Sequence, residues 1–254
     1  MLQSDLDYTR IQKEIELAQR IQVGLLPKQP PVVAGLDIWA GFRPANQIGG
    51  DFYDFIIGRN RNLTMVVGDI CGKGVSAAML MPMTRMVIRT AALGRHNHTP
   101  RDIVNRSNSL LYEDYTNTDM FATTFVGNFN PFNQTIVFAN AGHSPVIYIP
   151  FGQSAQLLLA DEAPIGVLQV CAVKNQRIQL KRGDVLIIGT DGLVEDYNLG
   201  VDLTTSYNWL LRKLELLVDR SARSVAETLF GSLQDLSRAE GQKDDQTLVV
   251  IKCV

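Results

Sequence analysis

The chain has 254 residues, of which 46% are hydrophobic and 20% are charged, enough for one large globular domain or two small ones with an ample core. The formal net charge of −2 excludes the electrostatic footprint of a nucleic-acid-binding protein, and no apolar run is long enough to insert into a membrane. Three cysteines without a pairing pattern, and an N-terminus without a signal-peptide core, predict a reduced, cytoplasmic protein.

The first 26 residues predict a helix. Apolar residues recur at steps of three and four from Ile11 to Leu25, with charged residues between them. Prolines at 27, 30 and 31 end the pattern. We therefore expect an amphipathic linker helix in residues 1–28 and a main domain in 29–254. The apolar stripe is too short to establish a coiled coil, so this helix could pack on its own domain or pair with a second copy as a homodimer.

Strands and helices then follow in blocks. Alternating apolar residues predict a strand at 35–42, and an apolar run predicts a deeply buried strand at 62–69. A long, Met-rich segment at 74–93 predicts a buried helix that Pro82 either kinks or divides. Another helix begins at Thr99, which can cap it, and Asp102 completes a capping box.

The second half of the chain returns to strands. A hairpin is predicted from strands at 121–129 and 134–142, joined by the turn "NPFN". Further strands are expected at 144–149, 155–160, 183–192 and 244–254, with two helices at 203–218 and 222–238. Hairpins in place of regular βαβ alternation predict an α+β protein with helices layered on mostly antiparallel sheets.

Acidic residues stand where apolar runs begin or end. The stretch "IGGDFYDF" places Asp51 beside a glycine pair, which lets the backbone approach a ligand closely, and Asp54 three residues later. Burying an unpaired carboxylate costs several kcal/mol, so each such acid needs a partner. Separate caps and turns, salt bridges to Arg or Lys, and a shared divalent cation such as Mg²⁺ or Mn²⁺ all remain open. The other acids of this kind are Asp69, Asp191, Asp244 and Asp245.

Five motifs in chain order carry a resemblance to a known family. They are "PANQIGGDFYDF", "VVGDICGKGVSAAML", "NAGHSPVIYI", "IIGTDGLVE" and "DDQTLVVI". Together they resemble the SpoIIE-like branch of the PPM family, the metal-dependent serine/threonine protein phosphatases of type 2C. The resemblance covers about residue 29 to the end, and "ELAQRIQVGLLP" resembles the linker helix that precedes this domain in bacterial members. It implies a β-sandwich of two mostly antiparallel sheets flanked by helices, with a two-metal centre at one end.

The resemblance also implies roles for particular residues. Asp69 would be shared by two Mn²⁺ or Mg²⁺ ions, with the backbone carbonyl of Ile70 beside it. Asp191 and Asp244 would complete the coordination of one metal, and Asp51 would be a ligand of the other. Two further acids could support these ligands from behind, namely Asp245 and Asp54, although Asp54 could equally serve a turn or a cap.

Two cations ~3.5–4 Å apart can activate a water molecule that attacks phosphorus in line, without a covalent phosphoenzyme. The histidine that follows the bridging aspartate in eukaryotic relatives is absent, because Cys71 stands there, so the acid for the leaving group is open. Arg43 and Lys73 are candidate phosphate contacts, the alternatives being a surface strand residue and a structural loop residue. His143 is expected to order a loop.

SpoIIE-like relatives act on phosphorylated anti-sigma-factor antagonists, which are small STAS-domain proteins in partner-switching circuits. The resemblance therefore implies a phosphoserine or phosphothreonine protein of that class as the substrate. The competing interpretation is a catalytically silent phosphatase-like module that binds a partner and signals through its linker helix. The presence of all four predicted aspartate ligands favours the enzyme.

Overall fold

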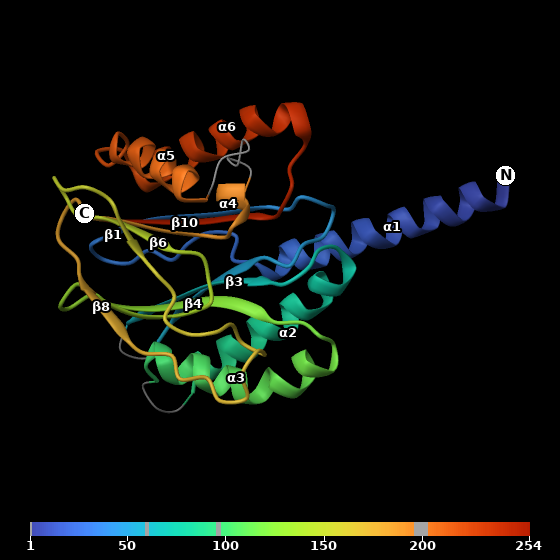
Figure 1. The fold of residues 1–254 in the computed structure, drawn as a ribbon, viewed down its shortest axis with the longest axis horizontal. Helices are drawn as coiled ribbons and strands as arrows, with labels where there is room; N and C mark the ends of the chain where they lie inside the picture. Colours follow the sequence, from blue (N-terminus) through green and yellow to red (C-terminus); the bar gives the residue numbers. More distant parts are fainter. Residues whose placement is uncertain (1, 59–60, 95–97, 196–202) are drawn as a thin grey trace.

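The computed structural model describes residues 2–58, 61–94, 98–195 and 203–254, and shows two packed β-sheets covered by helices on both outer faces (Figure 1). Every strand pair within the two sheets is antiparallel. Sheet A has the order β1 (Leu36–Arg43), β10 (Gln246–Cys253), β9 (Val185–Gly189), β6 (Val146–Ile149) and β7 (Gln156–Leu158). Sheet B has the order β2 (Phe52–Ile57), β3 (Leu63–Ile70), β4 (Ala122–Asn130), β5 (Thr135–Ala141) and β8 (Gln176–Gln179). This is the sandwich that the motifs predict.

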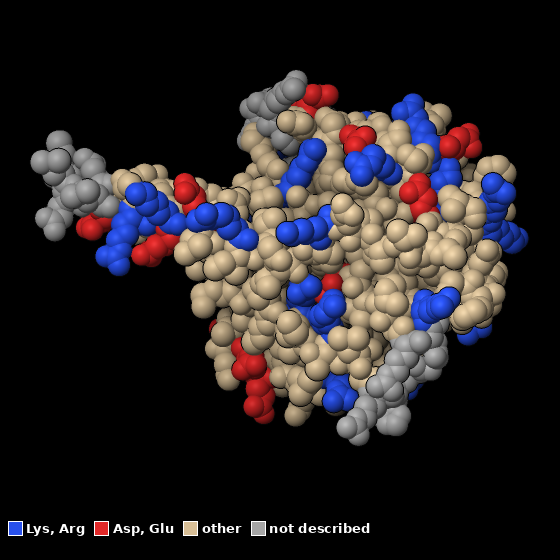
Figure 2. Space-filling model, turned by 180° about the vertical axis from the view of Figure 1, so that it is seen from behind, with Lys and Arg blue, Asp and Glu red and all other residues tan. Residues whose placement is uncertain are grey.

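Each sheet has its own pair of covering helices. Helices α2 (Val75–Ala92) and α3 (Pro100–Asn117) pack on sheet B, whereas α6 (Ala222–Glu240) packs on sheet A beside α5 (Leu203–Glu215). The short α4 (Gly192–Glu195) follows β9. Helix α1 (Leu2–Leu25) projects from the body, and in the space-filling view it carries both cationic and anionic side chains (Figure 2).

The continuous apolar run of β10 follows from burial on both faces. Val249 and Ile251 belong to the core between the sheets, whereas Leu248 and Val250 belong to the core between sheet A and its helices. Successive side chains of a strand point to opposite faces, so a strand between two apolar layers has no polar alternation. Because β10 is buried on both faces, the two acids that immediately precede it lie at the end of the sandwich.

Most predicted elements are present, and three were missed. The capping box of Thr99 and Asp102 is confirmed, and Pro82 lies inside one continuous helix, α2. The missed elements are β2, β8 and the single turn of α4. Strand β2 was not predicted because Asp54 interrupts its apolar sequence. That carboxylate is 2% exposed and is compensated by two guanidinium groups of α2, from Arg85 at 3.0 Å and Arg89 at 2.9 Å.

Within the described residues, no helix combines the length and hydrophobicity required to cross a membrane.

Substitution of Asp54 tests its structural role. We expect Asp54→Asn to lower the free energy of unfolding by about 3–5 kcal/mol, because it leaves the nearly buried Arg85 without a counter-charge. Urea unfolding measures this difference, with Asp114→Asn on the exposed side of α3 as the matched control. Equal stability of the two variants would show that the ion pair contributes nothing.

Candidate metal centre

Five aspartates gather at one end of the sandwich because four strands begin or end there. In sheet B, Phe52 at the start of β2 pairs with Gly68, so the flanking Asp51 and Asp69 lie on neighbouring strands. In sheet A, β10 pairs with β9, and Leu248 lies opposite Gly189. The remaining acids of the cluster stand just outside these two strands, at positions 191, 244 and 245. We call these five residues the carboxyl cluster.

The glycine pair before Asp51 is required by close packing. A Cβ atom on Gly49 would lie 1.9 Å from Oδ2 of Asp245, and one on Gly50 would lie 2.9 Å from the carbonyl oxygen of Ile70. Neither position can accept a side chain without displacement of its neighbour. The glycines thus allow the loop to approach both a buried carboxylate and the backbone carbonyl predicted as a metal ligand.

Asp245 holds this loop in place. Its Oδ1 accepts a hydrogen bond from the Ala45 N–H at 2.8 Å, and its Oδ2 accepts one from the Gly50 N–H at 2.8 Å. Both carboxylate oxygens therefore bind backbone donors, and the side chain is 8% exposed. This geometry positions the Gly49–Asp51 loop against the start of β10.

Thr190 joins the two sheets inside the cluster. Its hydroxyl donates to Oδ2 of Asp51 at 2.8 Å and accepts a hydrogen bond from the Thr247 N–H at 3.0 Å. The Thr190 N–H in turn donates to the Thr247 carbonyl at 3.1 Å. Asp51 from sheet B is thereby fixed to the two strands of sheet A that carry the other acids.

Burial and the charges of neighbouring acids raise the pKa values of Asp51 and Asp69 in the cluster. Burial raises the pKa of Asp69 to about 8, and the negative charges of Asp191, Asp244 and Asp245 add to this effect. The pKa of Asp51 is also raised well above its ordinary value, first by burial and then by the charges of Asp69 and Asp245. Without a cation, these carboxyl groups therefore retain protons that an exposed aspartate would have lost.

One lysine contacts the cluster. The Lys73 ammonium lies 2.6 Å from Oδ2 of Asp244 and donates to the Lys243 carbonyl at 2.7 Å. Its side chain is half exposed, so it stands at the rim. As the side chains are placed, no three Asp, Glu, His or Cys residues in the described part of the chain are arranged to hold one metal ion together.

Two predicted site residues have other partners. Arg43 donates to the carbonyl of Phe230 at 3.0 Å, and its guanidinium lies 4.3 Å from the centre of that ring. The side chain is thus engaged with α6, which differs from the phosphate contact considered for it. Asp54 likewise faces Arg85 and Arg89 on α2, which differs from the supporting position considered behind the metals.

His143 is buried beside the cluster. Its ring Nδ1 lies 2.9 Å from the hydroxyl of Thr123, which is the residue opposite Asp69 on β4. The backbone N–H of His143 donates to Oδ1 of Asn140 at 2.8 Å. Burial lowers the pKa of His143 to about 4, which keeps the imidazole neutral. These contacts agree with a residue that orders its loop.

Sequence reasoning missed two residues that support the cluster. Gln22 of α1 donates through Nε2 to the Gly49 carbonyl at 2.7 Å, and its Oε1 accepts from the Gly49 N–H at 3.0 Å. The sequence signal for Gln22 was a polar residue inside the apolar stripe of the first helix. The signal for Thr190 was a hydroxyl residue directly before an acid.

Comparison with known proteins decides the family. The sequence matches the family described as Stage II sporulation protein E (SpoIIE) over residues 59–254. The chain belongs to the SpoIIE family. This confirms the resemblance carried by the five motifs.

Relatives of this SpoIIE-family chain include phosphoserine phosphatase RsbU of Bacillus subtilis, which is 29% identical over 95% of this chain and 70% of RsbU. A structure of RsbU and RsbW domains from Mycobacterium tuberculosis is 26% identical, with a TM-score of 0.73, and covers 87% of this chain and 61% of that one. The SiaA-PP2C domain of Pseudomonas aeruginosa has the same fold, with 19% identity and a TM-score of 0.84 over 97% of this chain and 98% of that domain.

The raised pKa of Asp69 predicts how the stability of this SpoIIE-family protein depends on pH when metal is removed by a chelator. Between its ordinary value of 3.8 and about 8, the folded state binds more protons at Asp69 than the unfolded state does. The free energy of unfolding should therefore fall as pH rises through this window. Urea unfolding measures this fall, and Asp69→Asn should flatten it.

His143 requires a restricted window for this test. Burial lowers its pKa from 6.5 to about 4, so the unfolded state binds more protons at this residue than the folded state does. The free energy of unfolding therefore falls as pH falls from about 6.5 toward 4. His143 is present in both the wild-type chain and Asp69→Asn, so the difference between their slopes from pH 6.5 to about 8 reports on Asp69. Identical slopes for the wild-type chain and Asp69→Asn would contradict the raised pKa.

Proposed function

We propose that this chain is a metal-dependent serine/threonine protein phosphatase that hydrolyses phosphoserine or phosphothreonine. The observation that carries the proposal is the carboxyl cluster, in which burial and then the charges of neighbouring acids raise the pKa values of Asp51 and Asp69. Such a cluster has the oxygen donors that Mg²⁺ and Mn²⁺ prefer. Membership of the SpoIIE family and similarity to the phosphoserine phosphatase RsbU support the same reaction.

We assign the metal ligands as the motifs imply. Asp69 would be shared by two divalent ions together with the Ile70 carbonyl, with Asp191 and Asp244 on one ion and Asp51 on the other. The fit rests on Asp51 and Asp69, whose pKa values burial raises, and on Gly50, whose lack of a side chain lets the loop lie against the Ile70 carbonyl. When bound, the two ions supply charge neutralisation and an activated water. Binding requires a small rearrangement of the acids, because Lys73 now pairs with Asp244.

The protein's own residues have defined tasks in this proposal. Asp245 and Thr190 keep the Asp51 loop and sheet A in register by the hydrogen bonds described above. Lys73, once released from Asp244, stands at the rim, where its ammonium can meet a phosphoryl group. Arg43 is the weaker candidate for this phosphate contact, because its guanidinium donates to a backbone carbonyl of α6.

The proposed substrate is a phosphorylated STAS-domain anti-sigma-factor antagonist in a partner-switching pathway. Support comes from the family and from the similarity to RsbU, a phosphoserine phosphatase. A cytoplasmic location agrees with three free thiols, at Cys71, Cys171 and Cys253. The alternative, a silent binding module, predicts partner binding without phosphate release.

Asp69→Asn tests the enzymatic proposal. We expect it to reduce turnover of a phosphorylated STAS protein and of p-nitrophenyl phosphate in Mn²⁺ by at least about 100-fold, roughly 2.7 kcal/mol in the barrier. The wild-type rate should vanish with chelator, and Asp114→Asn on the exposed side of α3 should match the wild type. Activity that survives in folded Asp69→Asn would refute the ligand assignment. No activity of the wild-type chain in any divalent metal would favour the binding module.

We also propose that residues 1–28 form a linker that communicates with the phosphatase domain of residues 29–254. Its projecting part exposes apolar side chains, among them Ile11 at 54% and Ile21 at 58%, which a second copy of the helix would cover as a homodimer. Its base touches the catalytic loop directly, because Gln22 binds both backbone groups of Gly49. A signal that moves α1 would therefore act on the loop that carries Asp51.

Gln22→Leu tests this connection. The variant leaves the buried N–H and carbonyl of Gly49 without their partner, so we expect about a tenfold rise in the Mn²⁺ concentration for half-maximal rate. Gln19→Leu on the same helix is the matched control. Removal of residues 2–17 spares Gln22 and tests the dimer by light scattering. A monomeric parent chain, or an unchanged Mn²⁺ dependence in Gln22→Leu, would contradict the corresponding half of the proposal.

A further inference from the structure

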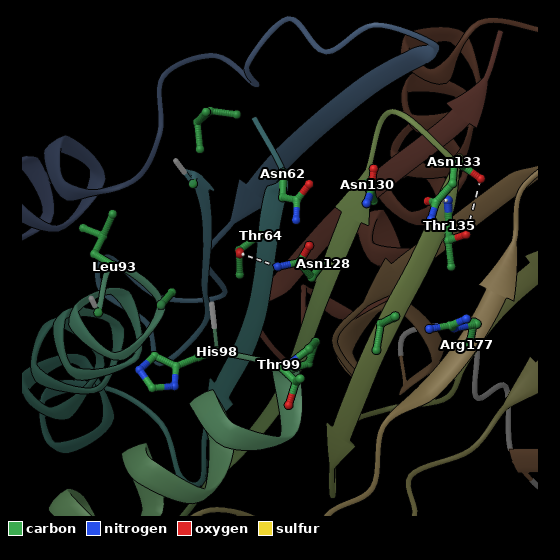
Figure 3. A pocket seen from close by; sticks show the side chains of 16 residues that line it. Asn62, Thr64, Leu93, His98, Thr99, Asn128, Asn130, Asn133, Thr135 and Arg177 are labelled. Carbon is green, nitrogen blue, oxygen red and sulfur yellow. Dashed lines mark hydrogen bonds between the residues drawn. The ribbon is translucent and has the colours of Figure 1, made fainter. Parts of the chain in front are cut away.

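A cavity of about 500 Å³ lies at the end of sheet B that is remote from the carboxyl cluster (Figure 3). It forms where β2 and β4 end, where β3 and β5 begin, and where α2 ends and α3 begins. Thr64 in its wall and Asp69 in the cluster are five residues apart on β3. This separation is about 17 Å along an extended strand, so the cavity is distinct from the proposed catalytic site.

The walls of the cavity are polar but contain no acid. Among the described residues that line it there is no aspartate or glutamate, although acids outnumber bases in the chain. Two side chains bear basic groups, Arg177 and His98, and Figure 3 shows the Arg177 guanidinium extending from β8 toward the neighbouring strands. The remaining polar wall is dominated by the amides of Asn62, Asn128, Asn130 and Asn133. This composition favours an anionic ligand that also forms neutral hydrogen bonds.

Several of these polar groups make no hydrogen bond to the described part of the chain. Oδ1 of Asn62 is buried and accepts no hydrogen bond from any described residue. Asn130 and Asn133 use their Oδ1 atoms to accept from the turn backbone, at Phe132 and Thr135, and within the described chain their NH₂ groups find no acceptor. The Arg177 side chain makes neither an ion pair nor a hydrogen bond to the parts of the chain that are described. The buried Asn62 oxygen is thus the orphaned acceptor among the described residues that line the cavity, whereas the Asn130 and Asn133 amides and the Arg177 guanidinium face solvent and are accessible to a ligand.

The cationic side of the cavity is held together by the fold. The backbone N–H of Arg101, in the first turn of α3, donates to Oδ1 of Asn175 at 3.0 Å. This contact brings the N-terminus of α3 to the segment that leads into β8 and Arg177. The Thr99–Asp102 capping box already satisfies the first turn of α3, so the positive charge that the cavity offers to a phosphate is that of Arg177, which can bind it with paired donors.

We propose that this cavity binds a mononucleotide, with the base among the asparagine amides and the phosphate beside Arg177. A nucleobase edge presents both donors and acceptors, and asparagine can pair with such an edge through both groups of its amide. Leu93, Pro100 and Val137 supply apolar surface for the ring. The volume lies within the range of about 300–1,000 Å³ for small-molecule sites. The proposal does not depend on the phosphatase activity.

Calorimetric titration of the full chain tests the site. The probes are the four ribonucleoside 5′-monophosphates, the matching nucleosides and inorganic phosphate, all in chelator so that metal does not recruit phosphate to the carboxyl cluster. We expect one monophosphate to bind with a stoichiometry of one, and its nucleoside to bind about tenfold or more weakly, as expected for loss of a charged hydrogen bond. The same binding should persist in Asp69→Asn.

Variants separate the two halves of the ligand. Arg177→Gln should weaken the monophosphate about tenfold and leave the nucleoside unchanged, whereas Asn62→Ala and Asn128→Ala should weaken both. Arg182→Gln, an exposed arginine outside the cavity, is the control. Thermal unfolding identifies any variant that fails to fold. If one asparagine variant does not fold, the other still tests the base contacts. Absence of binding at millimolar concentrations, equal affinity for inorganic phosphate, or binding unaffected by every variant would overturn the proposal.

Discussion

The structure depends on the carboxyl groups that gather at the place where the two sheets meet, of which Asp51 and Asp245 are buried. Asp51 and Asp69 come from sheet B, and the acids at 191, 244 and 245 come from the edge of sheet A. Burial raises the pKa values of Asp51 and Asp69, and repulsion from the neighbouring carboxylates adds to this effect. A bound cation would reverse this penalty, and a proton does so in part when no cation is present.

The surrounding elements are arranged to tolerate that repulsion. The two apolar cores, one between the sheets and one between sheet A and its helices, supply the stability that the cluster removes. Hydrogen bonds then place the acids. Asp245 holds the loop before β2, Thr190 joins Asp51 to sheet A, and Gln22 anchors the loop to the linker helix. The same loop therefore connects the carboxyl cluster to the projecting helix.

The local signals in the sequence predicted much of the fold. The hairpin of β4 and β5, the capping box at Thr99 and the alternation of β1 each depend on neighbouring residues, and each is present. Strand β2 was missed because its buried Asp54 is compensated by Arg85 and Arg89, which are distant in sequence. Position along the chain identified the acids, but their hydrogen-bond partners depend on how distant strands meet. The contacts of Arg43 with α6 and of Gln22 with Gly49 are long-range in the same way, so no local pattern could assign them.

The central claim is that divalent cations replace protons on the carboxyl cluster. Calorimetric titration of the metal-free chain with Mn²⁺ at neutral pH, repeated in buffers of different ionisation enthalpy, measures the protons released on binding. The account predicts net proton release that is reduced in Asp69→Asn, because the raised pKa of Asp69 keeps a proton there until metal arrives. Mn²⁺ binding without proton release, or no Mn²⁺ binding at all, would contradict it.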